Sequence, residues 1–318
     1  MKTIEIIVPC YNEEECVELF YTRICEVFEQ LKDYQFLITY IDDGSRDKTL
    51  EKIKKLADTA LEGKVQYLSF SRNFGKEAAI YAGFSNSTGD YVALMDADLQ
   101  HPPELLIKML HAIEEEGYDC ASARRVSRKG EPPVRSALAR AFYHLIGKVT
   151  VIDLVPGSTD YRLMKRQMVE AIVSMPESER FTKGLYAWVG FQNKWIEYEN
   201  VERAAGKTKW RFGGLLRYAY SGFVSFATTP LRGVVYLGLI IVLLSLVAAI
   251  WLFVSAVNGS ADTRTGYASL MIVILFLGGV IITILGMIGE YLARIYMEVK
   301  NRPKYIEKES NIKGHDND

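Results

Sequence analysis

The first part of the chain alternates short apolar runs with segments of helical periodicity. Four apolar runs predict buried parallel strands, at residues 3–9, 35–41, 65–70 and 91–95. Apolar positions at helical spacing predict helices between them, up to about residue 31 and over residues 47–61 and 77–84. Asn12 is the expected N-cap of the first helix. This order predicts an α/β fold, with helices on both faces of an open and largely parallel sheet.

Two later stretches are apolar on every side. Residues 234–257 and 267–289 contain no charged residue, and each exceeds the roughly 20 residues that a helix needs to cross a bilayer. The short, turn-like linker between them predicts a transmembrane helical hairpin. Lys and Arg gather before the first span and after the second, whereas the linker carries only Arg264. The positive-inside bias therefore predicts a multi-pass protein of the inner or plasma membrane, with its N-terminal part and its tail in the cytoplasm.

These patterns divide the chain into four parts. Residues 1–212 form the expected cytoplasmic α/β domain, and residues 213–232 form an aromatic-rich helix at the membrane interface. Residues 233–290 hold the two spans, and residues 291–318 form a cytoplasmic tail. Residues 134–149 predict another amphipathic interface helix, whose basic residues suit an anionic lipid head group.

Composition narrows the function classes. With 38 basic and 39 acidic residues, the charge is nearly balanced and does not indicate a nucleic-acid partner. The 4 cysteines form no CxxC pair, which fits a reducing compartment without a disulfide framework. The chain also contains neither the G-x-G-x-x-G nor the G-x-x-x-x-G-K-[ST] motif, which disfavours the standard dinucleotide fold and the P-loop.

Polar clusters follow each of the four predicted strands. Because the carboxyl ends of parallel strands meet at one edge of a sheet, we expect these clusters to form one ligand site. On an extended chain Asp96, Asp98 and Gln100 would share a face, and their oxygens suit Mg²⁺ or Mn²⁺ with positions left for a diphosphate. Asp42 and Asp43 suit ribose hydroxyls or a base edge, because carboxylates only accept hydrogen bonds. The clusters predict a nucleotide-diphosphate ligand.

Four segments resemble the signatures of a known enzyme family. They are VPCYNEE at residues 8–14, IDDGSRD at 41–47, SRNFGKE at 71–77 and DADLQ at 96–100. In this order they resemble family 2 glycosyltransferases with the GT-A fold, a Rossmann-like fold of nucleotide-diphospho-sugar transferases. More narrowly, essentially the whole chain is similar to polyprenyl-phosphate glycosyltransferases, relatives of dolichol-phosphate mannose synthase. The bacterial branch with two C-terminal membrane helices resembles it best.

The resemblance implies a membrane enzyme with two substrates. We expect it to move a sugar, glucose or N-acetylglucosamine, from a nucleotide-diphosphate sugar such as a UDP-sugar to polyprenyl (undecaprenyl) phosphate. The reaction would be inverting, would depend on Mg²⁺ or Mn²⁺, and would serve cell-envelope glycan modification on the cytoplasmic face. The glycines of the second span suit either packing within the hairpin or self-association. We expect a homo-oligomer, with a tetramer among the candidates.

The resemblance also assigns site residues. The nucleotide-sugar-binding set is Pro9, Tyr11, Glu13, Asp42, Asp43, Lys76 and Asp96. The metal set is Asp96, Asp98 and Gln100. The acceptor-phosphate set is basic and comprises Arg124, Arg125, Arg140, Arg203 and Lys209. Asp98 and Asp160 are the catalytic candidates.

Asp160 lies in a variant of a family motif, PGSTDYRL at residues 156–163, with Thr159 and Tyr161 as departures. A phosphate monoester has a second pKa of about 6 and arrives largely deprotonated, so a strong general base is not required. Asp160 then positions Arg162 or the acceptor. The alternative interpretation makes Asp160 the N-cap of a following helix.

Three other functions fit the sequence less well. A processive polysaccharide synthase would be expected to carry Q-x-x-R-W, but residues 192–195 (QNKW) are one residue short and have Lys for Arg. A non-catalytic membrane scaffold would tolerate loss of Asp96 and Asp98, yet both are present. A lipid flippase would need an internal polar path, for which two spans leave little room.

Overall fold

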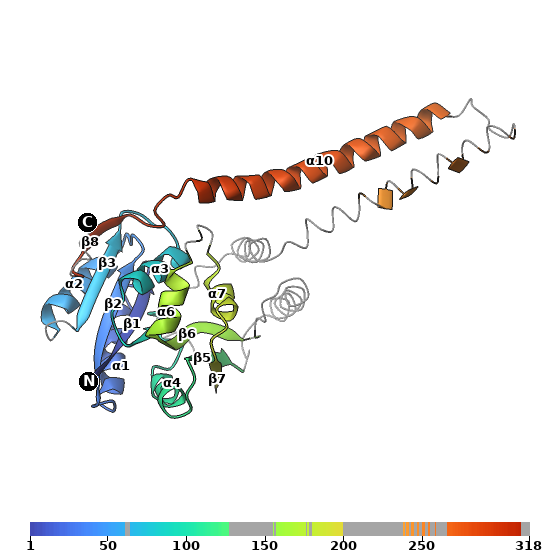
Figure 1. The fold of residues 1–318 in the computed structure, drawn as a ribbon. Helices are drawn as coiled ribbons and strands as arrows, with labels where there is room; N and C mark the ends of the chain where they lie inside the picture. The colour runs from blue at the N-terminus through green and yellow to red at the C-terminus, as the bar shows by residue number, and fades with distance from the viewer. Residues whose placement is uncertain are drawn as a thin grey trace. The chain divides into compact units, whose positions relative to one another are not determined.

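The computed structural model describes residues 1–60, 64–126, 155, 157–175, 177, 180–199 and 266–312, with single residues between 238 and 258. The chain divides into two compact units. The first unit is Met1–Phe226 together with Pro303–Asp318, and the second is Ala227–Arg302. Figure 1 shows the sheet of the first unit and the long helix of the second.

An eight-stranded mixed sheet forms the centre of the first unit, in the order β7-β5-β6-β4-β1-β2-β3-β8. The strands are β1 (Lys2–Cys10), β2 (Tyr34–Asp42), β3 (Val65–Phe70), β4 (Tyr91–Leu94), β5 (Cys120–Arg125), β6 (Ser158–Lys165), β7 (Asn193–Tyr198) and β8 (Glu307–Ser310). The four strands predicted from apolar runs are β1 to β4, and they pair in parallel. β6 pairs antiparallel with β4 and β5, and β8 pairs antiparallel with β3. The predicted α/β sheet is confirmed, with antiparallel additions on both sides.

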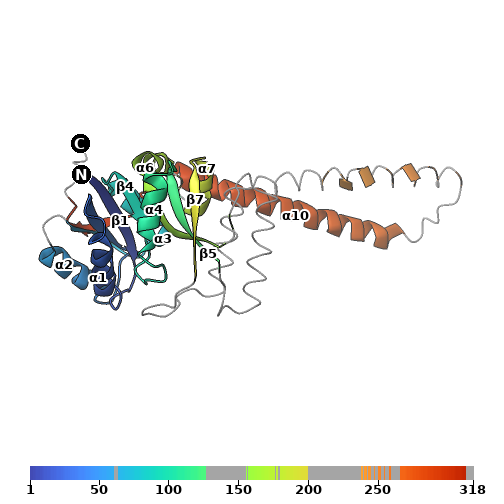
Figure 2. The same ribbon diagram turned by 90° about the horizontal axis from the view of Figure 1, so that it is seen from below.

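Helices cover both faces of this sheet (Figures 1 and 2). They are α1 (Val17–Phe28), α2 (Thr49–Thr59), α3 (Lys76–Asn86), α4 (Leu105–Glu114), α6 (Arg166–Val173) and α7 (Thr182–Trp188). Alternate residues of β1 point to opposite faces, as the pleat requires. Ile4, Ile6 and Val8 pack with α1, α2 and α4, whereas Ile7 packs with α3, α6 and α7.

Asn12 does not cap the first helix, so that prediction was wrong. α1 begins at Val17 with Cys16 in the N-cap position. Asn12 instead has a positive φ of 52°. Its amide donates to Ser45 Oγ at 2.9 Å, and its side-chain oxygen accepts from the Arg46 amide at 2.8 Å. Asn12 therefore joins the loop after β1 to the loop after β2, because Asn tolerates the left-handed conformation that this contact needs.

The second unit contains α10 (Gly266–Val299), which includes the predicted second span. Within the described residues, Phe276–Val299 is the one segment long and apolar enough to cross a membrane. The helix continues past residue 289, where the sequence pattern placed its end. The other predicted span, at 234–257, lies mostly outside the described residues, and the predicted interface helices at 134–149 and 213–232 lie wholly outside them.

One carboxylate lies in the middle of the sheet. The side chain of Glu5, on β1, is fully buried. It accepts hydrogen bonds from Thr39 Oγ1 at 2.7 Å, from the Thr88 amide at 2.6 Å and from the Gly89 amide at 2.9 Å. These donors make the buried carboxylate tolerable, because a buried polar group without partners is costly. Glu5 thereby fixes the turn between α3 and β4, which leads into the Asp96 loop.

Glu5→Ala should destabilise the first unit, because Thr39, Thr88 and Gly89 would lose their shared acceptor and two of these hydrogen bonds are buried. At about 3 kcal/mol in total, the thermal midpoint should fall by about 6–12 °C. The measurement is thermal unfolding of the full chain in detergent, followed by circular dichroism. The matched control is Glu51→Ala, which removes an exposed carboxylate on α2. Equal midpoints for the two variants would refute this role for Glu5.

Candidate active site

A pocket of about 290 Å³ lies where β1, β2 and β4 end and α3 begins. Among the predicted nucleotide-sugar residues, all but Asp42 line it, and Asp98 lines it as well. The lining residues that were not predicted are Cys10, Asn73, Gly75, Ala79 and Ala97. The pocket thus forms at the carboxyl ends of parallel strands, where open α/β sheets bind ligands.

The two carboxylates after β2 point in different directions. Asp42 accepts from Ser69 Oγ at 2.7 Å and from the Ser45 amide at 3.1 Å, and it lines a second pocket of about 250 Å³. Asp43 faces the first pocket and is also nearly buried. Of the two carboxylates predicted to contact the ribose or the base, Asp43 therefore lines the first pocket and Asp42 does not.

Asp43 organises the loop that follows β3. Its carboxylate accepts from Asn73 Nδ2 at 2.9 Å, from the Phe74 amide at 2.6 Å and from the Gly75 amide at 3.0 Å. Burial raises the pKa of Asp43 to about 6, although the Phe74 and Gly75 amides oppose that rise. Gly44 permits the close approach of the two loops, since a Cβ there would lie 2.5 Å from the Arg72 carbonyl carbon, and its φ is +67°.

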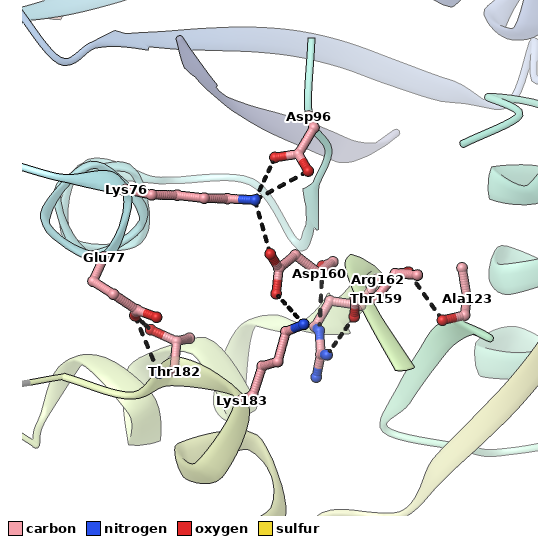
Figure 3. Close-up of polar contacts among 9 residues, drawn as sticks. All are labelled: Lys76, Glu77, Asp96, Ala123, Thr159, Asp160, Arg162, Thr182 and Lys183. Carbon is pink, nitrogen blue, oxygen red and sulfur yellow. Dashed lines mark hydrogen bonds and ion pairs between the residues drawn. The ribbon is translucent and has the colours of Figure 1, made fainter. Parts of the chain in front are cut away.

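Lys76, at the first position of α3, bridges two carboxylates (Figure 3). Its ammonium lies 2.7 Å from Asp96 Oδ1 and 2.8 Å from Asp160 Oδ2. Burial by itself would lower the pKa of Lys76, but the ion pairs with Asp160 and Asp96 raise it above its usual range. Lys76 therefore stays charged and joins the end of β4 to β6.

Asp160 lies within β6, so the N-cap interpretation is wrong. Besides Lys76, it faces the Lys183 ammonium of α7 at 3.7 Å. Burial alone would raise the pKa of Asp160, but Lys183 and Lys76 outweigh it and hold that pKa well below its usual range. A carboxylate held ionised between two ammonium groups is a poor proton acceptor, and it suits a positioning role.

Arg162 lies beside this cluster and is nearly buried. Its guanidinium lies 3.4 Å from the centroid of the Tyr186 ring and donates to the Thr159 carbonyl at 3.0 Å. Its Nε donates to the Asp160 carbonyl at 3.4 Å. Asp160 thus contacts Arg162 through its backbone, whereas its carboxylate contacts the two lysines.

The carboxylates after β4 do not follow the expected strand alternation. β4 ends at Leu94, and the following residues form a turn in which Leu99 has a φ of 53°. Asp98 Oδ1 accepts from the Gln100 amide at 3.2 Å. Asp96 and Asp98 present oxygens to the pocket, whereas Gln100 is outside its lining. Two carboxylates fit a hard divalent cation, although the described residues contain no group of three or more His, Cys, Asp or Glu side chains arranged to hold a metal.

The structure describes some of the predicted acceptor-phosphate residues. Arg124 and Arg125 are the last two residues of β5. Arg124 Nη1 lies 3.4 Å from Glu197 Oε1 across the pairing with β7. Arg140, Arg203 and Lys209 lie outside the described residues.

Lys183 is a site residue that the sequence patterns did not predict. Its position depends on Glu77, the residue after Lys76. Glu77 accepts from the Thr182 amide at 3.1 Å and from the Thr182 hydroxyl, which attaches the start of α7 to the start of α3 (Figure 3).

His101 was not predicted from the sequence either. Its ring nitrogen Nδ1 lies 2.7 Å from the Tyr198 hydroxyl, and burial lowers its pKa.

Comparison with known proteins identifies the family. The family model "Glycosyl transferase family 2" matches residues 5–173. The chain belongs to glycosyl transferase family 2. A second model, "GtrB C-terminal hairpin", matches residues 229–295, and this hairpin associates the enzyme with a membrane.

Individual relatives of this family 2 glycosyltransferase are similar over nearly their whole length. A bactoprenol glucosyl transferase of Shigella phage SfII is 41% identical over 309 residues, which cover 96% of this chain and 98% of the relative. An uncharacterized glycosyltransferase of Synechocystis, sll0501, is 44% identical, with 95% and 94% covered. Mannosyl-3-phosphoglycerate synthase from Rubrobacter xylanophilus superposes with a TM-score of 0.47 and 19% identity, over 69% of this chain and 71% of that chain. The predicted family is confirmed.

Lowering the pH through about 6 should loosen the loop after β3. Protonation of Asp43 weakens the charge-assisted hydrogen bonds from Phe74 and Gly75, and at pH 5 about nine-tenths of this carboxyl is protonated. Losing the charge costs roughly 1 kcal/mol, so the amide protection factors of residues 71–77 should fall about fivefold. Hydrogen exchange with mass spectrometry at pH 7.5 and 5 measures them.

Asp43→Asn is the control for this titration, since it cannot lose a proton in this range. Its loop should be weakly protected at both pH values. Equal protection of residues 71–77 in the unaltered chain at pH 7.5 and 5 would contradict the assignment to Asp43.

Proposed function

We propose that this family 2 glycosyltransferase moves glucose from UDP-glucose to a polyprenyl phosphate, with inversion at the anomeric carbon. The observation that carries the proposal is the 41% identity to a bactoprenol glucosyl transferase along 96% of the chain. The pocket at the strand ends supports it, because its carboxylates and Lys76 suit a nucleotide diphosphate. Attack by a phosphate oxygen opposite the leaving diphosphate produces the inversion.

The nucleotide part of the donor occupies the pocket near Pro9, Tyr11, Glu13 and Asp43. Asp96 and Asp98, with Gln100 next to them, are the residues that would hold Mg²⁺ or Mn²⁺. Such a cation, when bound, neutralises charge on the departing diphosphate. Lys76 remains charged beside Asp96. Together with the cation, its ammonium group would stabilise the negative charge on the departing diphosphate.

The acceptor needs positive charge and no strong base. Its phosphate is largely dianionic near neutral pH, so one oxygen is already a nucleophile. Asp160 keeps Lys76 and Lys183 in place instead of removing a proton. The proposed contacts of the acceptor phosphate include Arg124 and Arg125, which lie at the end of β5. Arg140, Arg203 and Lys209 complete the proposed set.

The remaining proposals concern the membrane. Two spans in the hairpin at residues 229–295 would place the first unit and the tail on the cytoplasmic side, because Lys and Arg flank the hairpin and its linker carries only Arg264. Glycines at 278, 279, 286 and 289 of α10 support close helix contacts and hence a homo-oligomer.

Transfer to the lipid phase tests the proposed reaction. Full-length protein in detergent, with undecaprenyl phosphate and Mn²⁺ or Mg²⁺, should move label from UDP-glucose into the organic phase, but not from UDP-N-acetylglucosamine or GDP-mannose. Asp98→Asn should reduce the rate by about a hundredfold or more, because it removes one of the two pocket carboxylates that would hold the divalent cation. Chelation by EDTA should stop the reaction.

Asp33→Asn, an exposed acid in the turn before β2, is the matched control and should leave the rate unchanged. Label from another nucleotide sugar would overturn glucose as the donor sugar. If no label from any of the three nucleotide sugars reached the organic phase, with folded protein and lipid acceptor present, the assignment of polyprenyl phosphate as acceptor would be overturned.

A further inference from the structure

The chain returns to the first unit after α10. Residues from Pro303 onward belong to that unit, and β8 pairs antiparallel with β3, which would be the edge strand of the sheet without it. The Ser71 amide donates to the Ile306 carbonyl at 2.9 Å, and the Tyr67 amide donates to Asn311 Oδ1 at 2.7 Å. β8 has the polar sequence EKES and was not predicted as a strand. These bonds occupy backbone groups that an edge strand would otherwise expose.

Tyr305 makes the principal side-chain contact of this tail. Its ring stacks on Phe70 with centroids 4.8 Å apart and an interplanar angle of 20°. Its hydroxyl accepts a hydrogen bond from Asn86 Nδ2 at 3.1 Å. Phe70 in turn meets the Phe74 ring edge-on at 5.8 Å. A row of three aromatic rings therefore runs from the tail through the end of β3 into the loop that follows it.

That loop is part of the nucleotide-sugar pocket. Asn73, Gly75 and Lys76 line the pocket directly. Phe74 does not, but its amide donates to Asp43 at 2.6 Å, which is the shortest hydrogen bond of that carboxylate. Phe74 therefore contacts Phe70 through its ring and Asp43 through its amide, so the aromatic row and the hydrogen bonds of Asp43 meet at one residue. Tyr305 limits where that ring can lie, through Phe70.

We infer that residues 303–312 are a positioning element of the donor site, and that Tyr305 acts through Phe70 and Phe74 on Asp43. The inference rests on the proposed function, since it takes the pocket to be where the nucleotide sugar binds. The donor site is then completed by a segment that follows the membrane hairpin in the chain. Tyr305 touches no substrate in this account, so it changes donor binding and leaves the chemical step alone.

Donor and acceptor kinetics of Tyr305→Ala test this in the full-length protein. The KM for UDP-glucose should rise about fivefold to tenfold, because an aromatic pair and its burial are lost. The KM for undecaprenyl phosphate and kcat should change less than about twofold, a split expected of a group that acts only on binding. Tyr305→Phe keeps the stacked ring and should restore most of the donor affinity. Glu307→Ala, on an exposed residue of β8, is the matched control.

A merely structural role would lower the thermal midpoint and the active fraction of Tyr305→Ala without moving the KM for UDP-glucose. That result would overturn the inference, as would a Tyr305→Phe variant no better than Tyr305→Ala. A wild-type protein that does not use UDP-glucose would refute the proposed function instead. In that case, hydrogen exchange without substrate tests whether Tyr305 positions the loop at residues 71–77. Tyr305→Ala should reduce the protection of residues 71–77 relative to wild type, and unchanged protection would overturn it.

Discussion

The ammonium group of Lys76 holds the site together. It lies between Asp96, which follows the parallel strand β4, and Asp160, which belongs to the antiparallel strand β6. The backbone pairs Leu94 with Arg162, so the two strands already meet, and the Lys76 bridge joins the two carboxylates beside the pocket. Lys183 approaches Asp160 from α7. Lys76 is thus the cation that Asp96 and Asp160 share, and Lys183 adds a second positive group beside Asp160.

Much of the fold could be read from the chain because β1 to β4 are continuous apolar runs, separated by helical patterns. The antiparallel additions were harder to predict. β8 carries charged residues and has no apolar face of its own, so its sequence shows no strand periodicity. It is a strand because its backbone pairs with β3. Asn12 shows the same limit in a loop. Its residue type suits a cap, but contacts with Ser45 and Arg46 place it elsewhere. Tertiary contacts thus decided what local patterns left open.

The site was predictable where it follows from parallel strands. Pro9, Tyr11, Glu13, Asp43 and Asp96 meet because carboxyl ends of neighbouring strands share one edge. Three features depend on folding that local sequence does not encode. Asp42 turns toward Ser69, the residues after Leu94 form a turn instead of an extended strand, and Lys183 arrives from α7 because Glu77 holds Thr182. Family resemblance identified Asp160, but its low pKa and its role follow from the lysines around it.

The most direct test of this account is the glucose-transfer rate of Lys76→Met, measured in a single turnover with saturating UDP-glucose and undecaprenyl phosphate. Removing the charge leaves Asp96 and Asp160 facing one another without their shared cation and takes a positive group from the departing diphosphate. We expect a fall of at least about a hundredfold, while Asp33→Asn retains the wild-type rate. A folded Lys76→Met protein that transfers glucose within about twofold of wild type would contradict the central place given to this bridge.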